Sequence, residues 1–238
     1  MIRPLLALPF LLAGVAPVQD DSATVSGVVR FDGVHKPRRL NDQINMDKHG
    51  GPHLDGRDVI DETVVVGIKG ELANVLIRLK NPPHKKFAAA AEPVTISATD
   101  YQFSPRVYVL RPEQTLILKN AGFDRFNFEV RTQRSSEMNV GILRGAQRET
   151  TFKVPEIGIK VSHICCPWQI AWVHVIDHPF FALTGADGKF EIKGLPAGEY
   201  EVEAWHEKFG TQSATVKIGA KGTCPQNFTF KGASELPK

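Results

Sequence analysis

The sequence has 238 residues, of which 42% are hydrophobic and 23% are charged. A chain of this length buries one large hydrophobic core or two smaller ones. The net charge of +3 is small, and the basic residues form no stripe with interleaved aromatic side chains. We therefore expect no nucleic-acid partner.

The first residues have the layout of a secretory signal peptide. Arg3 precedes an apolar run over residues 5–15, and the acidic residues Asp20 and Asp21 follow. The run is too short to span a bilayer. We expect residues 1–19 to be the signal peptide and the mature protein to be periplasmic or extracellular, with no transmembrane segment. An uncleaved membrane anchor is the alternative.

Short alternating runs rich in Val, Ile and Phe recur along the chain, separated by Gly, Pro and Asp. Helical periodicity is nearly absent, and residues 87–93 are interpreted as a linker or a single helical turn. The pattern predicts an all-β fold with two β-sandwich domains. The expected strands cover residues 24–33, 73–81, 93–98, 106–112, 115–120, 150–155, 160–164, 171–177, 189–194 and 200–205.

The C-terminal part contains a compact hairpin motif. Asp187 and Gly188 form a tight turn, a strand over 189–193 follows, and 194–198 is a second turn. The pattern DG-x-F-x-I-x-GLP-x-G-x-Y resembles the carboxypeptidase regulatory-like (transthyretin-like, carbohydrate-binding-like) domain. The resemblance implies a small transthyretin-like sandwich here.

The opening strands of such a module are present at 25–29 and 75–79, far upstream of the hairpin. We interpret the regulatory-like domain as split between residues 22–83 and 179–232, with a second domain, residues 84–178, inserted into a surface turn. Two consecutive domains are the alternative.

Metal-capable side chains are densest near the end of the second domain. Thiolates and imidazoles on a short loop between strands are typical of copper and zinc sites. These groups are His163, Cys165, Cys166, His174 and His178, with Trp168 and Trp172 beside them.

At this loop the sequence resembles the bacterial cupredoxin-like proteins that pair a copper domain with a regulatory-like module. The resemblance covers most of residues 24–218. It implies a cupredoxin-like Greek-key sandwich over 84–178, with copper as the cofactor. The matching pieces are FDG near the start, LANVLIRLKN, the surroundings of Pro105, the Pro-Trp of the copper loop, and DHPFFALTGADGKFEIKGLPAGEYEVEAWHEKFGTQ.

The copper ligands of that family are altered in this chain. Phe126 stands where the family has a histidine, in a segment of the form N-S-D-x-x-x-H-N. The family's loop Cys-x-x-His-Pro-Trp-Met is HICCPWQ here (163–169), so cysteine and histidine have exchanged ends and Gln169 replaces the axial methionine. A blue-copper centre needs two imidazoles and one thiolate, and this loop supplies one imidazole.

The candidate metal ligands are therefore His163, Cys165, Cys166 and Gln169, with copper(I) or zinc as the expected metal if one binds. The adjacent cysteines have other interpretations: buried hydrophobes, a vicinal disulfide, half of a bridge to Cys224, or a redox role. Because the chain has three cysteines, an oxidising compartment leaves at least one thiol unpaired or bound.

The remaining histidines are expected to be structural or exposed. His174 lies in an alternating strand and should point outward, away from a core formed by its valine neighbours. The resemblance implies that His178 and His206 are hydrogen-bonding structural histidines. Exposure in loops is expected for His35, His49, His53 and His84.

Catalytic motifs such as a phosphate loop, HExxH or G-x-S-x-G are absent from the sequence. We interpret the acidic loop residues Asp58, Asp61 and Glu62 as solvated surface carboxylates and not as a catalytic acid/base pair. We therefore expect no enzyme, but an exported cupredoxin-like protein with a degenerate copper site that serves as a binding or scaffold module of the cell envelope.

Two other functions stay open. The first is a copper protein for electron transfer or copper storage. The second is a protein that binds carbohydrate or another envelope component through the regulatory-like domain, where Trp205 is the candidate for stacking on a sugar ring. The partner is then an envelope component or a glycan.

Overall fold

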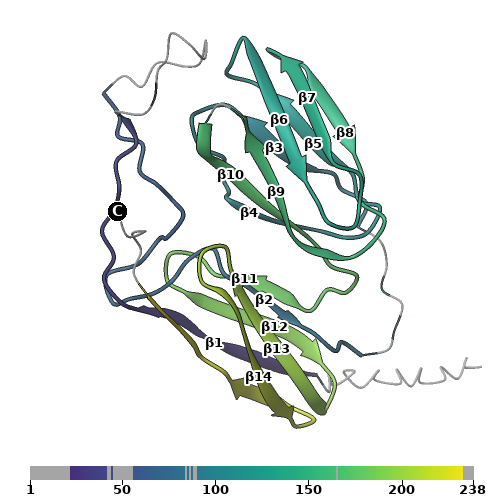
Figure 1. Cartoon of the computed structure of the whole chain (residues 1–238). Coiled ribbons are helices and arrows are strands. Elements are labelled where there is room, and N and C mark those ends of the chain that lie inside the picture. The colour runs from purple at the N-terminus through teal and green to yellow at the C-terminus, as the bar shows by residue number, and fades with distance from the viewer. Residues whose placement is uncertain are drawn as a thin grey trace, which may run out of the picture.

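The structure is a computed structural model that describes residues 22–41, 44, 56–83, 85, 87, 90–164 and 166–232. This part of the chain contains sixteen β-strands and no α-helix, which confirms the expected all-β fold. None of it forms a helix long and apolar enough to cross a lipid bilayer. The expected signal peptide, residues 1–19, lies outside the described residues. Figure 1 shows two bodies, one above the other.

The upper body, here called the insert sandwich, is built from the middle of the chain. Its strands are β3 (Val94–Ala98), β4 (Val107–Leu110), β5 (Leu116–Asn120), β6 (Arg125–Arg131), β7 (Met138–Leu143), β8 (Gln147–Thr150), β9 (Glu156–His163) and β10 (Cys166–Val175). They form one sheet in the order β4-β10-β9-β6-β7 and another in the order β3-β5-β8. Side chains from both sheets enclose one core, as expected for a sandwich.

The lower body, the split sandwich, uses strands from both ends of the chain. They are β1 (Ala23–Asp32), β2 (Leu76–Leu79), β11 (Phe181–Leu183), β12 (Lys189–Leu195), β13 (Gly198–His206), β14 (Gly210–Ile218), β15 (Gly222–Pro225) and β16 (Phe228–Lys231). One sheet is β12-β1-β15, with β16 also on β1, and the other is β11-β2-β13-β14. A second core lies between them. The pairing of β1 with β12 is the contact that the insertion hypothesis requires.

The predicted hairpin turn positions β12 against β1. Gly188 has a φ of +63°, and a Cβ atom there would lie 2.5 Å from the carbonyl oxygen of Val29. The backbone N–H of Val29 donates to the carbonyl of Gly188 at 2.8 Å. Only glycine permits both this conformation and this close approach.

One predicted strand is wrong. Residues 151–155 form no strand: β8 ends at Thr150 and β9 begins at Glu156. Phe152 between them is buried in the insert core, and its carbonyl accepts from the N–H of Glu113 at 2.7 Å. Pro155 has no N–H for a sheet ladder. The apolar residues of this segment therefore reflect burial of a connection.

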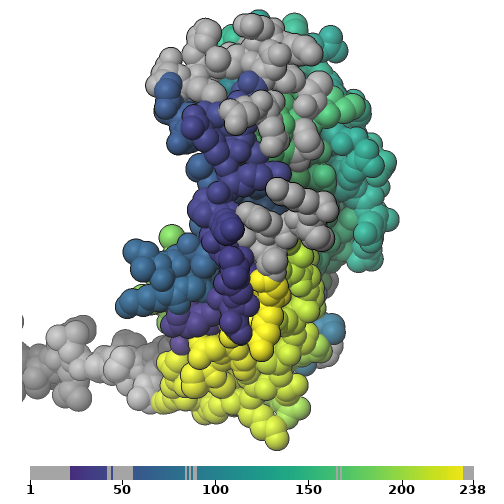
Figure 2. Space-filling model, turned by 60° about the vertical axis from the view of Figure 1, so that its left-hand side comes forward, coloured from purple at the N-terminus to yellow at the C-terminus, as the bar shows by residue number. Residues whose placement is uncertain are grey.

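The connection from β1 to β2 also differs from the predicted division. Its described residues 34–41 and 56–63, here called the strap, run from the split sandwich up over the insert sandwich (Figure 2). Leu40 and Val59 are buried in the insert core, and the N–H of Leu40 donates to the carbonyl of Val59 at 2.8 Å. Residues 22–83 therefore do not all pack in the split sandwich.

The two sandwiches pack face to face at what we call the domain junction. Leu76 and Trp205 are cross-strand partners on β2 and β13, and Val107 and Trp172 are partners on β4 and β10. Leu76 and Val107 are buried although neither belongs to a sandwich core. The rings of Trp172 and Trp205 contact each other, with centroids 5.5 Å apart. The outer face of the sheet that contains β2 and β13 therefore covers the outer face of the sheet that contains β4 and β10.

Candidate functional site

The predicted ligand loop lies at one end of the insert sandwich. His163 ends β9, Cys166 begins β10, and the two are cross-strand partners, so their side chains point to the same side of the sheet. Cys166 is fully buried and His163 is nearly so. Cys165 lies outside the described residues.

Phe126 closes the position that the family resemblance assigns to a second imidazole. Its ring is fully buried, and its centroid lies 4.2 Å from that of the His163 imidazole. Phe128, the cross-strand partner of His163, lies 4.6 Å from Phe126 between ring centroids. Phe123 is 5.1 Å from Phe126 on the same measure. The second-imidazole position is therefore part of a packed aromatic cluster.

Gln169 is fully buried and held by one hydrogen bond. Its Nε2 donates to the carbonyl of Asp100 at 2.8 Å, while its Oε1 has no hydrogen-bond partner among the described residues. The buried hydroxyl of Tyr101 also has none within that part of the chain. Burial raises the pKa of Tyr101, and the charge of Cys166 adds to this effect. Among the described residues of the loop region, the Gln169 amide oxygen, the Tyr101 hydroxyl and the Trp168 indole N–H are buried without a hydrogen-bond partner.

These residues do not fit a blue-copper centre, which needs two imidazoles and a thiolate in one plane. His163 is the imidazole at the loop, and His174 is eight residues along β10 from Cys166, roughly 25 Å at the rise of a strand. Within the described residues, no group of three or more His, Cys, Asp or Glu side chains is placed to hold a metal ion. Cys166 would supply a thiolate, which is a soft ligand of the kind that suits copper(I).

Cys224 lies in β15 of the split sandwich. Its thiol is free and lies 3.8 Å from the carbonyl oxygen of Lys217. The alternative of a bridge from one of the adjacent cysteines to Cys224 is therefore not formed.

The prediction for His174 is wrong. The side chain points away from the insert core, as the strand alternation indicates, but it is fully buried at the domain junction. Its Nδ1 accepts from the N–H of Gly158 at 3.1 Å, and its ring lies 4.5 Å from that of Trp205 between centroids. Burial, with the nearby charge of Arg78, lowers the pKa of His174 to about 3. The face that the sequence assigns to solvent is covered by the split sandwich.

Trp205, the candidate for stacking on a sugar ring, lies at the same junction. It is half-buried and in contact with the rings of Trp172 and His174. Its contacts at the domain junction leave less of the Trp205 ring for stacking on a sugar.

The other described histidines lie as follows. His178 and His206 are hydrogen-bonding structural residues, as expected. The Nδ1 of His178 accepts from the N–H of Phe180 at 3.2 Å, and that of His206 accepts from the N–H of Lys208 at 3.1 Å. His35 is half-buried rather than exposed. Outside the described residues lie His49, His53 and His84.

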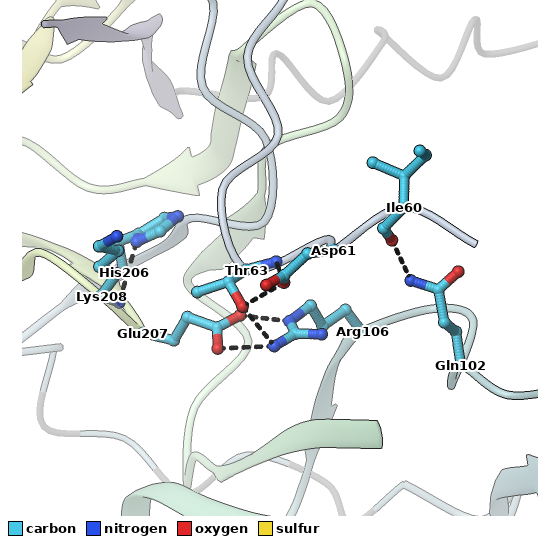
Figure 3. A network of polar contacts seen from close by, with 8 residues as sticks. All are labelled: Ile60, Asp61, Thr63, Gln102, Arg106, His206, Glu207 and Lys208. Atoms are coloured by element: carbon cyan, nitrogen blue, oxygen red, sulfur yellow. Dashed lines mark hydrogen bonds and ion pairs between the residues drawn. The ribbon is translucent and has the colours of Figure 1, made fainter. Parts of the chain in front are cut away.

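A polar network that the sequence did not indicate joins both sandwiches and the strap (Figure 3). Arg106 binds both carboxylate oxygens of Glu207, and its Nη2 lies 3.3 Å from the Thr63 hydroxyl. The Thr63 hydroxyl donates to Asp61 at 2.6 Å. Gln102 donates through its side chain to the carbonyl of Ile60. Three segments far apart in sequence are therefore connected by polar contacts.

The network corrects the interpretation of the acidic loop residues. Asp58 is exposed as expected, but Asp61 and Glu62 are half-buried. Burial opposes ionisation of Asp61, but the hydrogen bonds from Thr63, together with the charge and hydrogen bond of Arg38, outweigh burial and lower the pKa of Asp61. Burial raises the pKa of Glu62, against the opposing charge of Arg106. Neither residue is a freely solvated loop carboxylate.

No protein-family model matches the chain, and no curated protein matches it. Several solved structures resemble parts of it, among them a nitrite reductase, a purple cupredoxin and an amicyanin. The Cu-containing nitrite reductase from Thermus scotoductus SA-01 matches 42% of this chain at 18% identity, with a TM-score of 0.34, and the match spans only 28% of that enzyme.

The other two matches span nearly all of the smaller proteins concerned. A purple cupredoxin from Nitrosopumilus maritimus matches 35% of this chain and 99% of its own length, at 17% identity and a TM-score of 0.31. Amicyanin from Paracoccus versutus matches 42% of this chain and 97% of its own length, at 12% identity and a TM-score of 0.32.

Proposed function

We propose that this protein is an exported, non-catalytic scaffold or binding module of the cell envelope, whose cupredoxin-like domain has lost its blue-copper centre. The observation that carries the proposal is the contact between Phe126 and His163, with ring centroids 4.2 Å apart. A buried phenyl ring at this position supplies no ligand and fills the space that a second imidazole needs. The loop end is thereby a packed core rather than a redox centre.

The domain junction supports a scaffold role. The Arg106–Glu207 ion pair and the Trp172–Trp205 contact connect the sandwiches, and the strap crosses from one to the other. Buried contacts of this kind hold two domains in one fixed orientation, whereas domains joined by small polar interfaces usually move. A fixed pair of sandwiches presents a constant surface to a binding partner.

Copper(I) storage is the second candidate, and a specific observation favours it. Cys166 and His163 are cross-strand partners, and the Gln169 Oε1 is buried without a partner among the described residues. A thiolate, an imidazole and a weak oxygen ligand suit copper(I) better than copper(II). Such a site holds the metal without cycling it, so it fits storage better than electron transfer.

A metal titration separates these functions. We expect the protein, purified without an affinity tag, to show no intense visible absorption after copper(II) is added. Titration with copper(I) under anaerobic conditions then distinguishes the scaffold, which binds none, from the storage protein, which binds one ion through Cys166. The variant Cys166→Ser should abolish that binding, with Cys224→Ser as the matched control. An intense blue spectrum from the unmodified protein contradicts both proposals.

Glycan binding through the regulatory-like domain finds less support, since Trp205 is engaged with His174 and Trp172. A glycan-array screen of the whole protein tests it. Binding that survives Trp205→Ala would point to a different surface of the split sandwich.

A further inference from the structure

The domain junction contains a histidine that the loop site does not use. His174 is fully buried on the outer face of β10, edge-on to Trp205 of β13, with the two rings at 75°. His174 belongs to the insert sandwich and Trp205 to the split sandwich. Their contact therefore exists only while the two sandwiches are docked.

The hydrogen bonding of His174 requires a neutral imidazole. Its Nδ1 accepts from the backbone N–H of Gly158, so the ring proton resides on Nε2, which has no partner among the described residues. A second proton can bind only at Nδ1, where it would face the Gly158 N–H, donor against donor. Protonation therefore breaks the one hydrogen bond that this side chain makes there.

Gly158 is suited to this contact by its backbone. Its φ is +81°, and a Cβ atom at this position would lie 3.8 Å from the Trp205 ring. Glycine adopts this conformation without strain. The N–H of Gly158 can therefore point at His174.

The charged groups packed around the His174 imidazole would not stabilise its protonated form. From β2, Arg78 places a positive charge near the ring, which lowers the pKa of His174 further after the effect of burial. From β13, Glu203 binds Arg78, with Nη2 and Oε1 2.6 Å apart, so its negative charge is already engaged.

The neighbouring β9 carries one carboxylate near this face, and that carboxylate is engaged elsewhere. Glu156 accepts from the Thr132 hydroxyl and from the N–H groups of Gln133 and Arg134. From β9, Lys160 is the cross-strand partner of Trp172, two residues before His174. From β4, the partner of His174 is the apolar Val109. The surroundings therefore stabilise the neutral imidazole of His174 relative to its protonated form.

We propose that His174 makes the docking of the two sandwiches acid-sensitive, because its neutral form fits the junction and its protonated form does not. When the sandwiches separate, the imidazole is solvated and regains an ordinary pKa near 6.5. The undocked form then binds a proton that the docked form cannot, so acid favours undocking. Between about pH 7.5 and about pH 4.5, His174 alone raises the ratio of undocked to docked protein roughly 100-fold.

Hydrogen exchange of the whole protein measures acid-favoured undocking directly at the domain junction. The exchange rate of the Gly158 amide, corrected for the intrinsic effect of pH, should rise roughly 100-fold between these two pH values. Amides of β5, in the sheet far from the junction, should keep their protection. Fluorescence of Trp172 and Trp205 provides a second readout of undocking.

Two variants remove the titration in different ways. His174→Phe keeps an aromatic ring against Trp205, and His174→Gln keeps an acceptor for the Gly158 N–H. Either variant that folds should lose the pH dependence at the junction. The comparison variant is His206→Phe, because His206 is also buried and stacks on Phe209 within the split sandwich. Burial is the main cause that lowers the pKa of His206 to about 4, with a smaller effect of the Arg106 charge, and this burial remains when the sandwiches separate. The His206 variant should therefore keep most of the acid effect.

Three results would overturn the proposal. In the first, junction protection in the unmodified protein is the same at both pH values. In the second, a His174 variant shows the same acid effect as the unmodified protein. In the third, β5 loses protection together with the junction, which would indicate global unfolding in place of undocking.

Discussion

Arg106, directly before β4, and Glu207, directly after β13, form a two-point ion pair across the domain junction. Their side chains are only 3% and 6% exposed. The Nη2 of Arg106 donates to the Oε2 of Glu207 at 2.9 Å and also lies 3.3 Å from the Thr63 hydroxyl. One guanidinium thus links the insert sandwich, the split sandwich and the strap.

Breaking this pair on one side should be strongly destabilising. Glu207→Gln leaves the Arg106 charge buried without its counter-ion, and we expect a loss of about 3–5 kcal/mol in the free energy of unfolding. The double variant Arg106→Met/Glu207→Leu removes both charges and should recover most of that loss. Urea denaturation measures all three proteins.

The control for this experiment is an exposed ion pair. Arg144 and Asp124 are 2.9 Å apart with side chains 52% and 78% exposed. Arg144→Gln should change stability by less than about 0.5 kcal/mol. If Glu207→Gln and Arg144→Gln lowered the free energy of unfolding equally, the buried Arg106–Glu207 pair would contribute no more to stability than an exposed pair.

Restoring the ligand pattern should restore a blue-copper centre. The triple variant Phe126→His/His163→Cys/Cys166→His supplies two imidazoles and a thiolate at the end of β9, with Gln169 as the axial ligand. We expect intense visible absorption when copper(II) is added to this variant. Phe126→His alone leaves the thiolate at the start of β10 and should stay colourless. Failure of a folded triple variant to bind copper(II) would show that the loop backbone itself has diverged.

The aromatic cluster around Phe126 should contribute to stability as a core element. Phe126→Ala removes a fully buried ring and should lower the free energy of unfolding by about 3–5 kcal/mol. Leu143→Ala is the control, since Leu143 is 66% exposed, and its effect should stay below about 0.5 kcal/mol. A small effect of Phe126→Ala would indicate a loosely packed pocket with room for a ligand.

Glu62 should oppose folding at neutral pH. Burial raises its pKa, the charge of Arg106 opposes the shift, and the charges of Asp61 and Glu207 add to it. The folded state therefore holds the proton more tightly than the unfolded state, so stability increases as pH falls through the folded pKa towards the ordinary value of 4.5.

A neutral substitute removes this penalty. Glu62→Gln should stabilise the protein at about pH 7 by less than about 1 kcal/mol, because the side chain is partly solvated. The gain should vanish below the ordinary glutamate pKa, where both side chains are neutral. Denaturation curves at both pH values measure it. A less stable variant at neutral pH would mean that Arg106 holds Glu62 as a needed anion.

Export is tested at the N-terminus. The apolar run over residues 5–15 predicts that the mature chain begins near Asp20. N-terminal sequencing of protein isolated from its native host identifies the first residue. An intact Met1 on protein from the cytoplasm would contradict export.

The local sequence pattern was sufficient to predict the β-structure and to identify the altered ligand loop. The turn around Asp187 and Gly188 indicated a strand over 189–194, and β12 covers Lys189–Leu195. Such hairpins depend on backbone conformations that a few adjacent residues specify. The departure of Phe126 from the ligand pattern is also visible in the sequence, because it concerns the chemical type of single side chains.

Tertiary structure alone decided what covers each outer face. His174 alternates with core valines, so its pattern matches an exposed residue, yet it is fully buried against Trp205. Leu40 likewise lies far upstream of the insert core in which it packs. Alternation along a strand reports which side chains share a face, but burial of the outer face depends on docking between segments distant in sequence.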